Sequence, residues 1–143
     1  MYLFIINPRS GGGAGGRTWH IVEALLKEKQ VKYETLFTHS ADEAEQSVVK
    51  ALQQHEKWDA AVVIGGDGTI HSILGALGHK GVPLAVIPAG SGNDTARGFG
   101  IPLEPQAALE AALGDLYLEA DLLSSSEGYT LTAVASGFDA QVA

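Results

Sequence analysis

The strongest constraint on the fold is a run of five short apolar residues, 60–64, that leads directly into a glycine-rich turn, 65–69. Short β-branched runs of this kind are typical of buried parallel strands. After the turn, apolar residues recur with the spacing i, i+3, i+4 and i+7 from Ile70, which places them on one face of a helix. The sequence therefore predicts a unit of strand, glycine turn and helix, around which the rest of the chain is organised.

The composition of this turn indicates a phosphate site. Glycine has no Cβ, so a ligand can approach the backbone closely, and the N-terminus of the following helix offers free N–H groups and a positive dipole end to an anion. Asp67 lies inside the turn and would repel a phosphate unless a cation separated them. The economical interpretation is a phosphate site that works with Mg²⁺, which takes one or two carboxylates together with phosphate oxygens.

Two further loops of small residues follow strand-like runs. Residues 2–6 precede a glycine-rich loop at 7–16, and residues 82–87 precede a loop at 88–97 that carries amide and carboxylate side chains. The first loop lacks the Gly-Lys-Ser/Thr ending of a Walker A loop, and no acidic residue ends the second strand as a dinucleotide-binding fingerprint requires. Because parallel strands end at one edge of a sheet, we expect the loops to share a crevice.

The remaining elements alternate along the first two thirds of the chain. The hydrophobic pattern predicts a helix at about 18–29, a strand at 33–37 with Thr38 directly after it, a helix opened by the capping box of Ser40 and Glu43, and a helix that starts with Pro105 and stops at Gly114. Alternating strands and helices predict an α/β fold with a mainly parallel sheet.

The C-terminal part changes pattern. Residues 116–122 alternate between apolar and polar types, which predicts a half-buried strand, and a turn at 124–128 separates them from another predicted strand at 129–135. This change indicates the opening of a second, β-rich domain. The predicted division is a nucleotide-binding α/β domain at 1–123 and the start of a truncated β-rich domain at 124–143.

Composition narrows the classes of function. The 143 residues are 45% apolar, enough for one domain with a core. A net charge of −8 argues against nucleic acid as a partner. The absence of cysteine excludes disulfides and thiolate zinc sites. No apolar run approaches the roughly 18 residues of a membrane span, and the N-terminus enters a strand without a leader, so a cytoplasmic location is expected.

Three motifs, at 7–11, 65–69 and 88–94, resemble in order and spacing the catalytic domain of the soluble diacylglycerol kinase family. The family includes bacterial lipid kinases, sphingosine kinases and ceramide kinases. The residues 95–102, Asp121 and 137–140 also look like family landmarks, so the resemblance covers the whole chain. NAD kinases and phosphofructokinases share the glycine turn alone, whereas the loop at 90–94 favours the lipid kinases.

The resemblance implies a three-layer nucleotide-binding domain with a mainly parallel sheet, like that of NAD kinases and diacylglycerol kinases. In the family a β-sandwich domain follows, which here is only begun or absent, and the site lies in the cleft between the two. The implied reaction transfers the γ-phosphoryl group of ATP to the hydroxyl of a diacylglycerol-like lipid, with Mg²⁺. The expected partners are the nucleotide, the lipid acceptor, the inner face of the membrane as a peripheral contact, and a second copy in a homodimer.

The resemblance also assigns roles to residues of this chain. Asp67 is expected to orient or deprotonate the attacking hydroxyl, and Asp67, Asp94 and Asp121 to organise the metal. The expected nucleotide contacts are Asn7, Pro8, Arg9, Ser10, Gly11, Thr38, Gly65, Gly66, Asp67, Gly68, Thr69, Ile70, His71, Ser72, Ser91, Gly92 and Asn93.

Two departures from the family pattern qualify the expected activity. Ser72 occupies a position where family members usually have Glu. The chain is also about half of the expected family length, so the lipid contacts and a carboxylate base are expected in the other half. The 143-residue piece should therefore bind nucleotide weakly and show little or no kinase activity by itself. A kinase of a soluble substrate such as NAD, and a non-catalytic nucleotide-binding module, are the alternatives.

Overall fold

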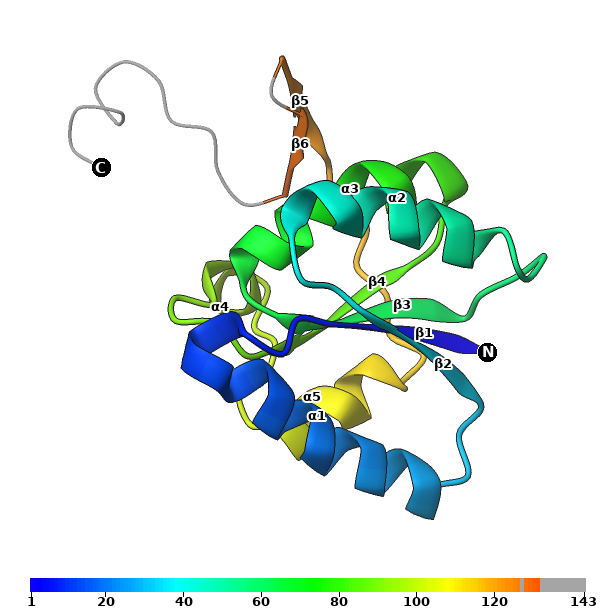
Figure 1. Ribbon diagram of the computed structural model, residues 1–143, viewed down its shortest axis with the longest axis vertical. Coiled ribbons are helices and arrows are strands. Elements are labelled where there is room, and N and C mark those ends of the chain that lie inside the picture. The colour runs from blue at the N-terminus through cyan, green and yellow to red at the C-terminus, as the bar shows by residue number, and fades with distance from the viewer. Residues whose placement is uncertain (127, 132–143) are drawn as a thin grey trace.

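A computed structural model describes residues 1–126 and 128–131 of the chain. Its centre is a parallel sheet of four strands in the order β2-β1-β3-β4 (Figure 1). The strands are β1 (Tyr2–Ile6), β2 (Tyr33–Phe37), β3 (Ala60–Gly65) and β4 (Leu84–Pro88). In their register Ile6 lies beside both Phe37 and Ile64, and Gly65 lies beside Pro88. All four strands therefore end at the same edge of the sheet.

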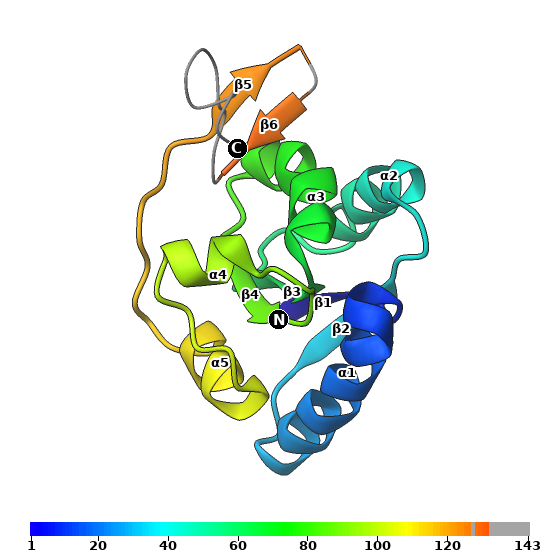
Figure 2. The same cartoon turned by 90° about the vertical axis from the view of Figure 1, so that its left-hand side faces the viewer.

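Helices cover both faces of the sheet, which confirms the predicted three-layer α/β fold. The helices α2 (Ala41–Leu52) and α3 (Asp67–Lys80) pack on one face, whereas α1 (Ser10–Glu28) and α5 (Pro105–Ala112) pack on the other (Figures 1 and 2). The short helix α4 (Asp94–Gly98) follows β4.

Two hydrophobic cores result from the alternation of side chains along each central strand. In β3, Ala61 and Val63 join the core under α2 and α3, whereas Val62 and Ile64 join the core under α1 and α5. Each of these four side chains is completely buried. Burial of one Val, Ile or Leu side chain contributes about 1.5–3 kcal/mol, so the central strands hold the three layers together.

Local sequence signals place most helix ends correctly. The Ser40 hydroxyl accepts a hydrogen bond from the Glu43 backbone N–H at 3.4 Å, as the predicted capping box requires. Pro105 opens α5, and the Glu104 carboxylate caps that helix. The helix α3 ends where Gly81 adopts the left-handed conformation. Strands β3 and β4 end one residue later than predicted, and α3 begins at Asp67, three residues before the periodic apolar run.

The prediction of a strand at 116–122 is wrong. These residues form no strand in the structure, and the side chains of Leu116 and Leu118 are 98% and 77% exposed. A strand needs a neighbour to complete its backbone hydrogen bonds, and alternating hydrophobicity carries no information about a neighbour. The described residues instead pair antiparallel in β5 (Leu123–Ser125) and β6 (Gly128–Thr130), so the predicted turn at 124–128 is shorter.

Several C-terminal predictions are not tested. Most of the predicted strand at 129–135, and the landmark at 137–140, lie outside the described residues. The division of the chain into domains at 123/124 stays a prediction. Within the part of the chain that the structure describes, none of the helices combines the length and the apolar character needed to cross a bilayer.

The first glycine loop is more ordered than the sequence suggests. The helix α1 begins at Ser10 rather than Thr18, although Gly11, Gly12 and Gly13 have positive φ angles and interrupt its regular conformation. Gly15 explains the tight packing here, because a Cβ at this position would lie 1.9 Å from the carbonyl oxygen of Asn7. The absence of a side chain at Gly15 lets the start of α1 lie against the end of β1.

We predict that Gly15→Ala destabilises the protein. The new methyl group would force the loop after β1 away from α1, and overpacking of this kind costs about 1–3 kcal/mol. Gly16→Ala is the matched control, because its Cβ would lie 3.5 Å from the nearest atom, the carbonyl oxygen of Pro8. Urea denaturation should show a lower free energy of unfolding for the first variant only. Equal values for both variants would contradict this account of the packing.

Candidate nucleotide-binding site

The loops after β1, β3 and β4 meet at the edge where the strands end, as expected. They surround a pocket of about 380 Å³. Ligands of open α/β sheets bind at this edge. The pocket is lined by Asn7, Ser10, Gly11, Gly66, Asp67, Gly68, Thr69, Gly90, Ser91 and Gly92.

Asn7 connects the first loop to the second. Its side-chain amide donates a hydrogen bond to the Thr69 hydroxyl at 3.0 Å, and its backbone N–H donates to the carbonyl of Ile64 at 2.9 Å. Its side-chain oxygen accepts from the backbone N–H of Arg9 at 3.1 Å, and its carbonyl accepts from the Ser10 hydroxyl at 2.9 Å. The conformation of the first loop is therefore fixed by an amide rather than by glycine alone.

The second loop places an open helix end in the pocket. Gly66 is the N-cap residue of α3, and within the described part of the chain no side chain caps this end. The first N–H groups of a helix have no partner inside the helix, so they and the helix dipole can bind an anion. Gly66 also allows the close approach of the third loop, because a Cβ on Gly66 would lie 2.9 Å from the Cα of Gly90.

Asp67 joins the second loop to the third. Its two carboxylate oxygens accept hydrogen bonds from the backbone N–H groups of Asp94, at 2.9 Å, and Thr95, at 2.8 Å. Burial acts to raise the pKa of Asp67, but hydrogen bonds from the backbone and hydroxyl of Thr95 and the backbone of Asp94 outweigh it, so the pKa lies below its ordinary value. Asp67 is therefore ionised at neutral pH and is a weak proton acceptor.

Asn93 shapes the third loop from the inside. It adopts a left-handed conformation with φ 56°. Its side-chain oxygen accepts from the Gly90 N–H at 2.9 Å, and its side-chain amide donates to the Gly90 carbonyl at 3.0 Å. Both polar groups of the side chain are thus used to hold Gly90, and Asn93 does not line the pocket. The structure gives this predicted nucleotide contact a positioning role.

The other predicted nucleotide residues lie around the pocket rather than in its lining. Thr38 is buried, and its N–H donates to the Ile6 carbonyl at 2.8 Å. Ile70 belongs to the core, and His71 is exposed. The Ser72 hydroxyl donates to the carbonyl of Thr69 at 2.8 Å, inside the helix. None of these four residues lines the pocket, and neither do Pro8, Arg9 and Gly65.

Two residues that help to form the pocket are not among the predicted nucleotide contacts. Gly90 lines the pocket, and the Arg97 side chain donates from its Nε to the Gly92 carbonyl at 3.0 Å. The glycine composition of the third loop was a signal for Gly90, because two loops that cross closely need small residues. Arg97 belongs to the landmark at 95–102, but its contact with Gly92 depends on how the chain turns into α4.

The structure brings together two of the three predicted metal residues. Carboxylate oxygens of Asp67 and Asp94 each lie 3.7 Å from the point where a Cβ on Gly92 would stand. Two carboxylates at the rim of a phosphate pocket fit the donor set that Mg²⁺ takes together with phosphate oxygens. Within residues 1–126 and 128–131, no group of three or more His, Cys, Asp or Glu side chains could hold a metal ion.

Asp121 lies apart from the other two carboxylates. It is exposed, and its neighbour Leu122 approaches Gly78 near the C-terminal end of α3. Asp67 is at the opposite end of that helix, and a helix rises about 1.5 Å per residue, so about 16 Å of helix separates Asp67 from Gly78. The described structure therefore does not place Asp121 in the metal site.

Comparisons with known proteins find relatives along most of the chain. A family model described as the diacylglycerol kinase catalytic domain matches residues 1–125. A diacylglycerol kinase of Mycobacterium tuberculosis (strain ATCC 25618 / H37Rv) is 34% identical in an alignment that covers 96% of this chain and 46% of that protein. Sphingosine kinase B of Dictyostelium discoideum is 32% identical over 77% of this chain and 15% of its own length.

A solved structure gives the same result for the fold. A crystal structure of a diacylglycerol kinase from Bacillus anthracis str. Sterne matches with a TM-score of 0.71 at 25% identity. The matched region is 90% of this chain but only 44% of the Bacillus anthracis chain. The chain thus spans less than half the length of these relatives.

We predict that Asn93→Gly loosens the third loop. Glycine keeps the left-handed conformation but loses both hydrogen bonds to Gly90, each worth about 0.5–1.5 kcal/mol. The amide of Gly90 should exchange its hydrogen faster, which NMR can measure. Ser91→Ala is the control, because the exposed Ser91 side chain takes no part in the hydrogen bonds between Asn93 and Gly90. Unchanged exchange at Gly90 in Asn93→Gly would show that other contacts fix the loop.

We predict that Asp67→Asn lowers stability in a pH-dependent manner. The carboxylate caps α4, and the loss of a cap costs about 0.5–2 kcal/mol. Because the folded-state pKa is lowered, the carboxylate stabilises the fold above its ordinary pKa of 3.8, and this contribution is lost as the pH falls through the folded-state pKa.

Denaturation at a series of pH values measures this effect. The difference in unfolding free energy between wild type and Asp67→Asn should be constant near neutral pH and shrink in acid. The control Asp121→Asn removes an exposed carboxylate that the described structure leaves outside the pocket. If the difference in unfolding free energy between wild type and Asp67→Asn does not change with pH, the ionised carboxylate of Asp67 is not the source of the stabilisation.

Proposed function

Since the chain belongs to the diacylglycerol kinase catalytic domain family, we propose that it is the nucleotide-binding part of an ATP-dependent lipid kinase. The proposed reaction transfers the γ-phosphoryl group of ATP to the hydroxyl of a diacylglycerol-like lipid. The observation that carries the proposal is the pocket at the open N-terminus of α3, bounded by three loops and by the carboxylates of Asp67 and Asp94.

The first step of the proposal is that the phosphates of ATP lie against the loop backbones. Gly66 and Gly68 leave the first turn of α3 accessible, and the side chains of Asn7, Ser10 and Thr69 line the same pocket. The backbone N–H groups and the Thr69 hydroxyl can donate to an anion without a positive side chain, whereas the Ser10 hydroxyl donates to the Asn7 carbonyl. An anion in this pocket is held by local N–H groups and the helix dipole.

The second step concerns charge. Asp67 and Asp94 would hold Mg²⁺, whose chemistry is to neutralise negative charge on the phosphates. The hydroxyl oxygen of the lipid bonds to the γ-phosphorus, the bond from that phosphorus to the β–γ bridging oxygen breaks, and ADP leaves. The hydroxyl proton passes to a base. Because Asp67 has a lowered pKa, its proposed role is to orient the site, and we assign the base to the remainder of a longer protein.

The expected partners follow from the same proposal. The lipid acceptor, a peripheral contact with the inner face of the membrane and a homodimer are proposed for the intact enzyme, as is a cytoplasmic location. The chain described here is acidic, so any membrane contact should depend on lipid recognition rather than on attraction to anionic headgroups.

One observation favours a second function, a nucleotide-binding module without catalysis. Ser72 stands where the family usually has Glu, and its hydroxyl is used within α3 by donating to the Thr69 carbonyl. A serine used in this way offers no carboxylate to the loops around the pocket. An NAD kinase-like activity is a third candidate, which the match to the diacylglycerol kinase family model disfavours.

We predict that the 143-residue chain binds ATP weakly with Mg²⁺ and transfers no phosphate by itself. Calorimetry with ATP, in the presence and absence of Mg²⁺, measures the binding. Addition of Mg²⁺ should strengthen binding to wild type but have little effect on Asp67→Asn, whereas the control Asp121→Asn should respond like wild type. Loss of the Mg²⁺ effect in Asp121→Asn alone would place the metal elsewhere.

The full-length protein, assayed with labelled ATP, should phosphorylate diacylglycerol. Asp67→Asn should lower turnover about 100-fold or more, because charge stabilisation of this kind is a large part of catalysis. Label on NAD and not on lipid would reject the lipid kinase. ATP binding without label on diacylglycerol, sphingoid base or NAD would support the non-catalytic module instead.

A further inference from the structure

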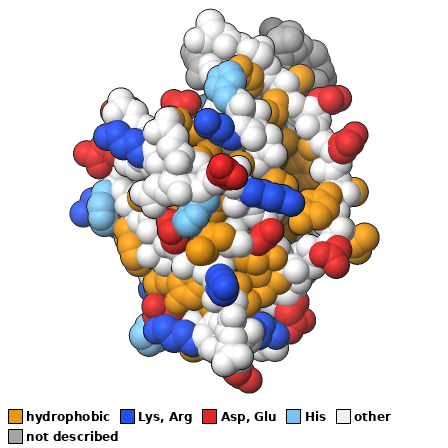
Figure 3. Space-filling model, turned by 90° about the vertical axis from the view of Figure 1, so that its right-hand side faces the viewer, with side chains coloured by type: hydrophobic (Ala, Val, Ile, Leu, Met, Phe, Trp, Pro, Cys, Tyr) orange, Lys and Arg blue, Asp and Glu red, His pale blue; other side chains and the backbone are white. Residues whose placement is uncertain are grey.

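A second, larger pocket lies at the opposite edge of the sheet, where the strands begin. Its volume is about 620 Å³. Figure 3 looks onto this edge and shows basic, acidic and imidazole side chains around the middle of the face, with hydrophobic side chains below them. The lining residues come from the C-terminal ends of α2 and α3, the segment before β3, the turn before β4 and Tyr117.

The turn after α3 opens one side of this pocket. Gly81 adopts the left-handed conformation with φ 63°, which ends the helix and turns the chain toward β4. A Cβ on Gly81 would meet no described atom within 4 Å, so the space above the turn is free. Val82 and Pro83 follow directly and line the pocket as apolar residues.

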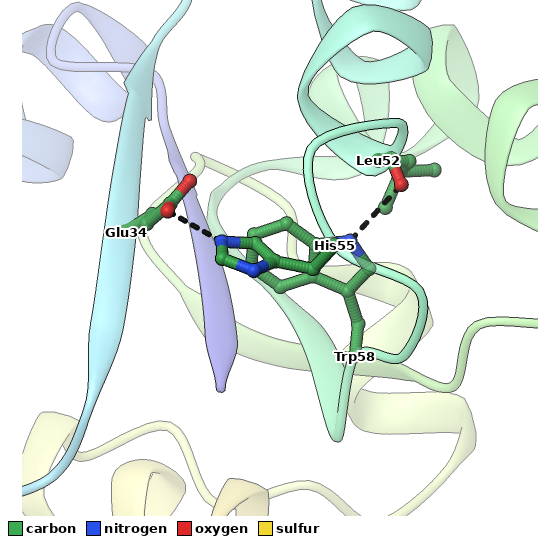
Figure 4. Close-up of polar contacts among 4 residues, drawn as sticks. All are labelled: Glu34, Leu52, His55 and Trp58. Carbon is green, nitrogen blue, oxygen red and sulfur yellow. Dashed lines mark hydrogen bonds and ion pairs between the residues drawn. The ribbon is translucent and has the colours of Figure 1, made fainter.

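The opposite wall is a rigid aromatic cluster (Figure 4). Trp58 is buried, and its indole N–H donates to the carbonyl of Leu52 at 3.2 Å. The imidazole of His55 lies edge-to-face on the indole, with ring centres 4.7 Å apart, and its Nε2 contacts the Glu34 carboxylate at 2.6 Å. Each ring therefore has one polar contact besides the contact with the other ring, so the protein itself holds both rings in place.

The charges at the rim favour an anion. Lys57 and Lys80 line the pocket from two different segments. Two carboxylates also line the pocket. Asp59 forms an ion pair with the amino group of Met1. Glu56 offsets part of the positive charge of the lysines. Two ammonium groups around one pocket are notable in a chain whose net charge is −8.

We propose that this pocket binds a small phosphate monoester with an aromatic body. The phosphate would lie between Lys57 and Lys80, and the ring would lie against Tyr117, Val82 and Pro83. Tyr117 is 63% exposed, so its ring can contact a ligand without rearrangement of the core. The pocket volume falls within the roughly 300–1,000 Å³ of small-molecule sites and exceeds what a phosphate group alone would fill. This site is separate from the proposed ATP pocket and does not depend on it.

Two-dimensional NMR of the 143-residue chain tests the proposal with 1-naphthyl phosphate. The chain has two tryptophans, so Trp19→Phe assigns the indole signal of Trp58. Saturable shifts are expected at the Trp58 indole and at the Gly81 amide, with a dissociation constant of about 1 mM or tighter. Inorganic phosphate and 1-naphthol should each bind more weakly than the combined molecule. Shifts confined to Gly66, Gly68 and Ser91 would overturn the proposal, as would the absence of saturation.

Charge variants test the orientation of the ligand. Lys57→Gln and Lys80→Gln should each weaken binding about two- to fivefold, which is the range for an exposed ion pair. Glu56→Gln should strengthen binding by removing a repulsive carboxylate. Lys29→Gln is the control and should leave the affinity unchanged, because Lys29 is the C-cap residue of α1 and does not line the pocket. Equal affinities for all four variants would overturn the phosphate assignment, and weaker binding by Glu56→Gln would reverse the proposed charge preference.

Discussion

The carboxylate of Asp67 joins two loops that lie 27 residues apart in the sequence, and the geometry of the candidate site depends on this contact. Through hydrogen bonds of 2.9 and 2.8 Å to the N–H groups of Asp94 and Thr95, it fixes the start of α4 relative to the start of α3. The side chain of Asn93 then holds Gly90, and the backbones at Gly90 and Gly66 meet without intervening side chains. The rigid wall of the pocket is thus made from backbone.

This arrangement explains how an acidic residue can stand inside a proposed phosphate site. An isolated carboxylate there would repel the ligand, but Asp67 is partly neutralised by N–H dipoles, which also lower its pKa. The same hydrogen bonds leave it a weak base. A positioning carboxylate with a nearby partner, Asp94, is consistent with phosphoryl transfer, in which the protein mainly supplies orientation and charge compensation.

The two edges of the sheet carry different kinds of site. At the edge where the strands end, glycines expose the backbone, and the proposed ligand is held by N–H groups. At the edge where the strands begin, side chains form the pocket, with Trp58 and His55 as a fixed wall and lysines at the rim. Family membership supports the proposal for the first site, whereas the second has to be judged from its residues, because a fold hosts sites of many kinds.

The sequence by itself determined the layered α/β fold, because buried strands and amphipathic helices have different hydrophobic periods, and it located the three glycine loops that surround the pocket. It also identified Asp67 as unusual from its place in a glycine turn. Only the tertiary structure decided that the Asn93 side chain is hydrogen-bonded to Gly90, that Asp121 precedes a residue near the C-terminal end of α3 whereas Asp67 lies at its N-terminal end, and that residues 116–122 have no strand. These three results depend on which backbone groups become neighbours across the fold, and a one-dimensional pattern of residue types does not contain that information.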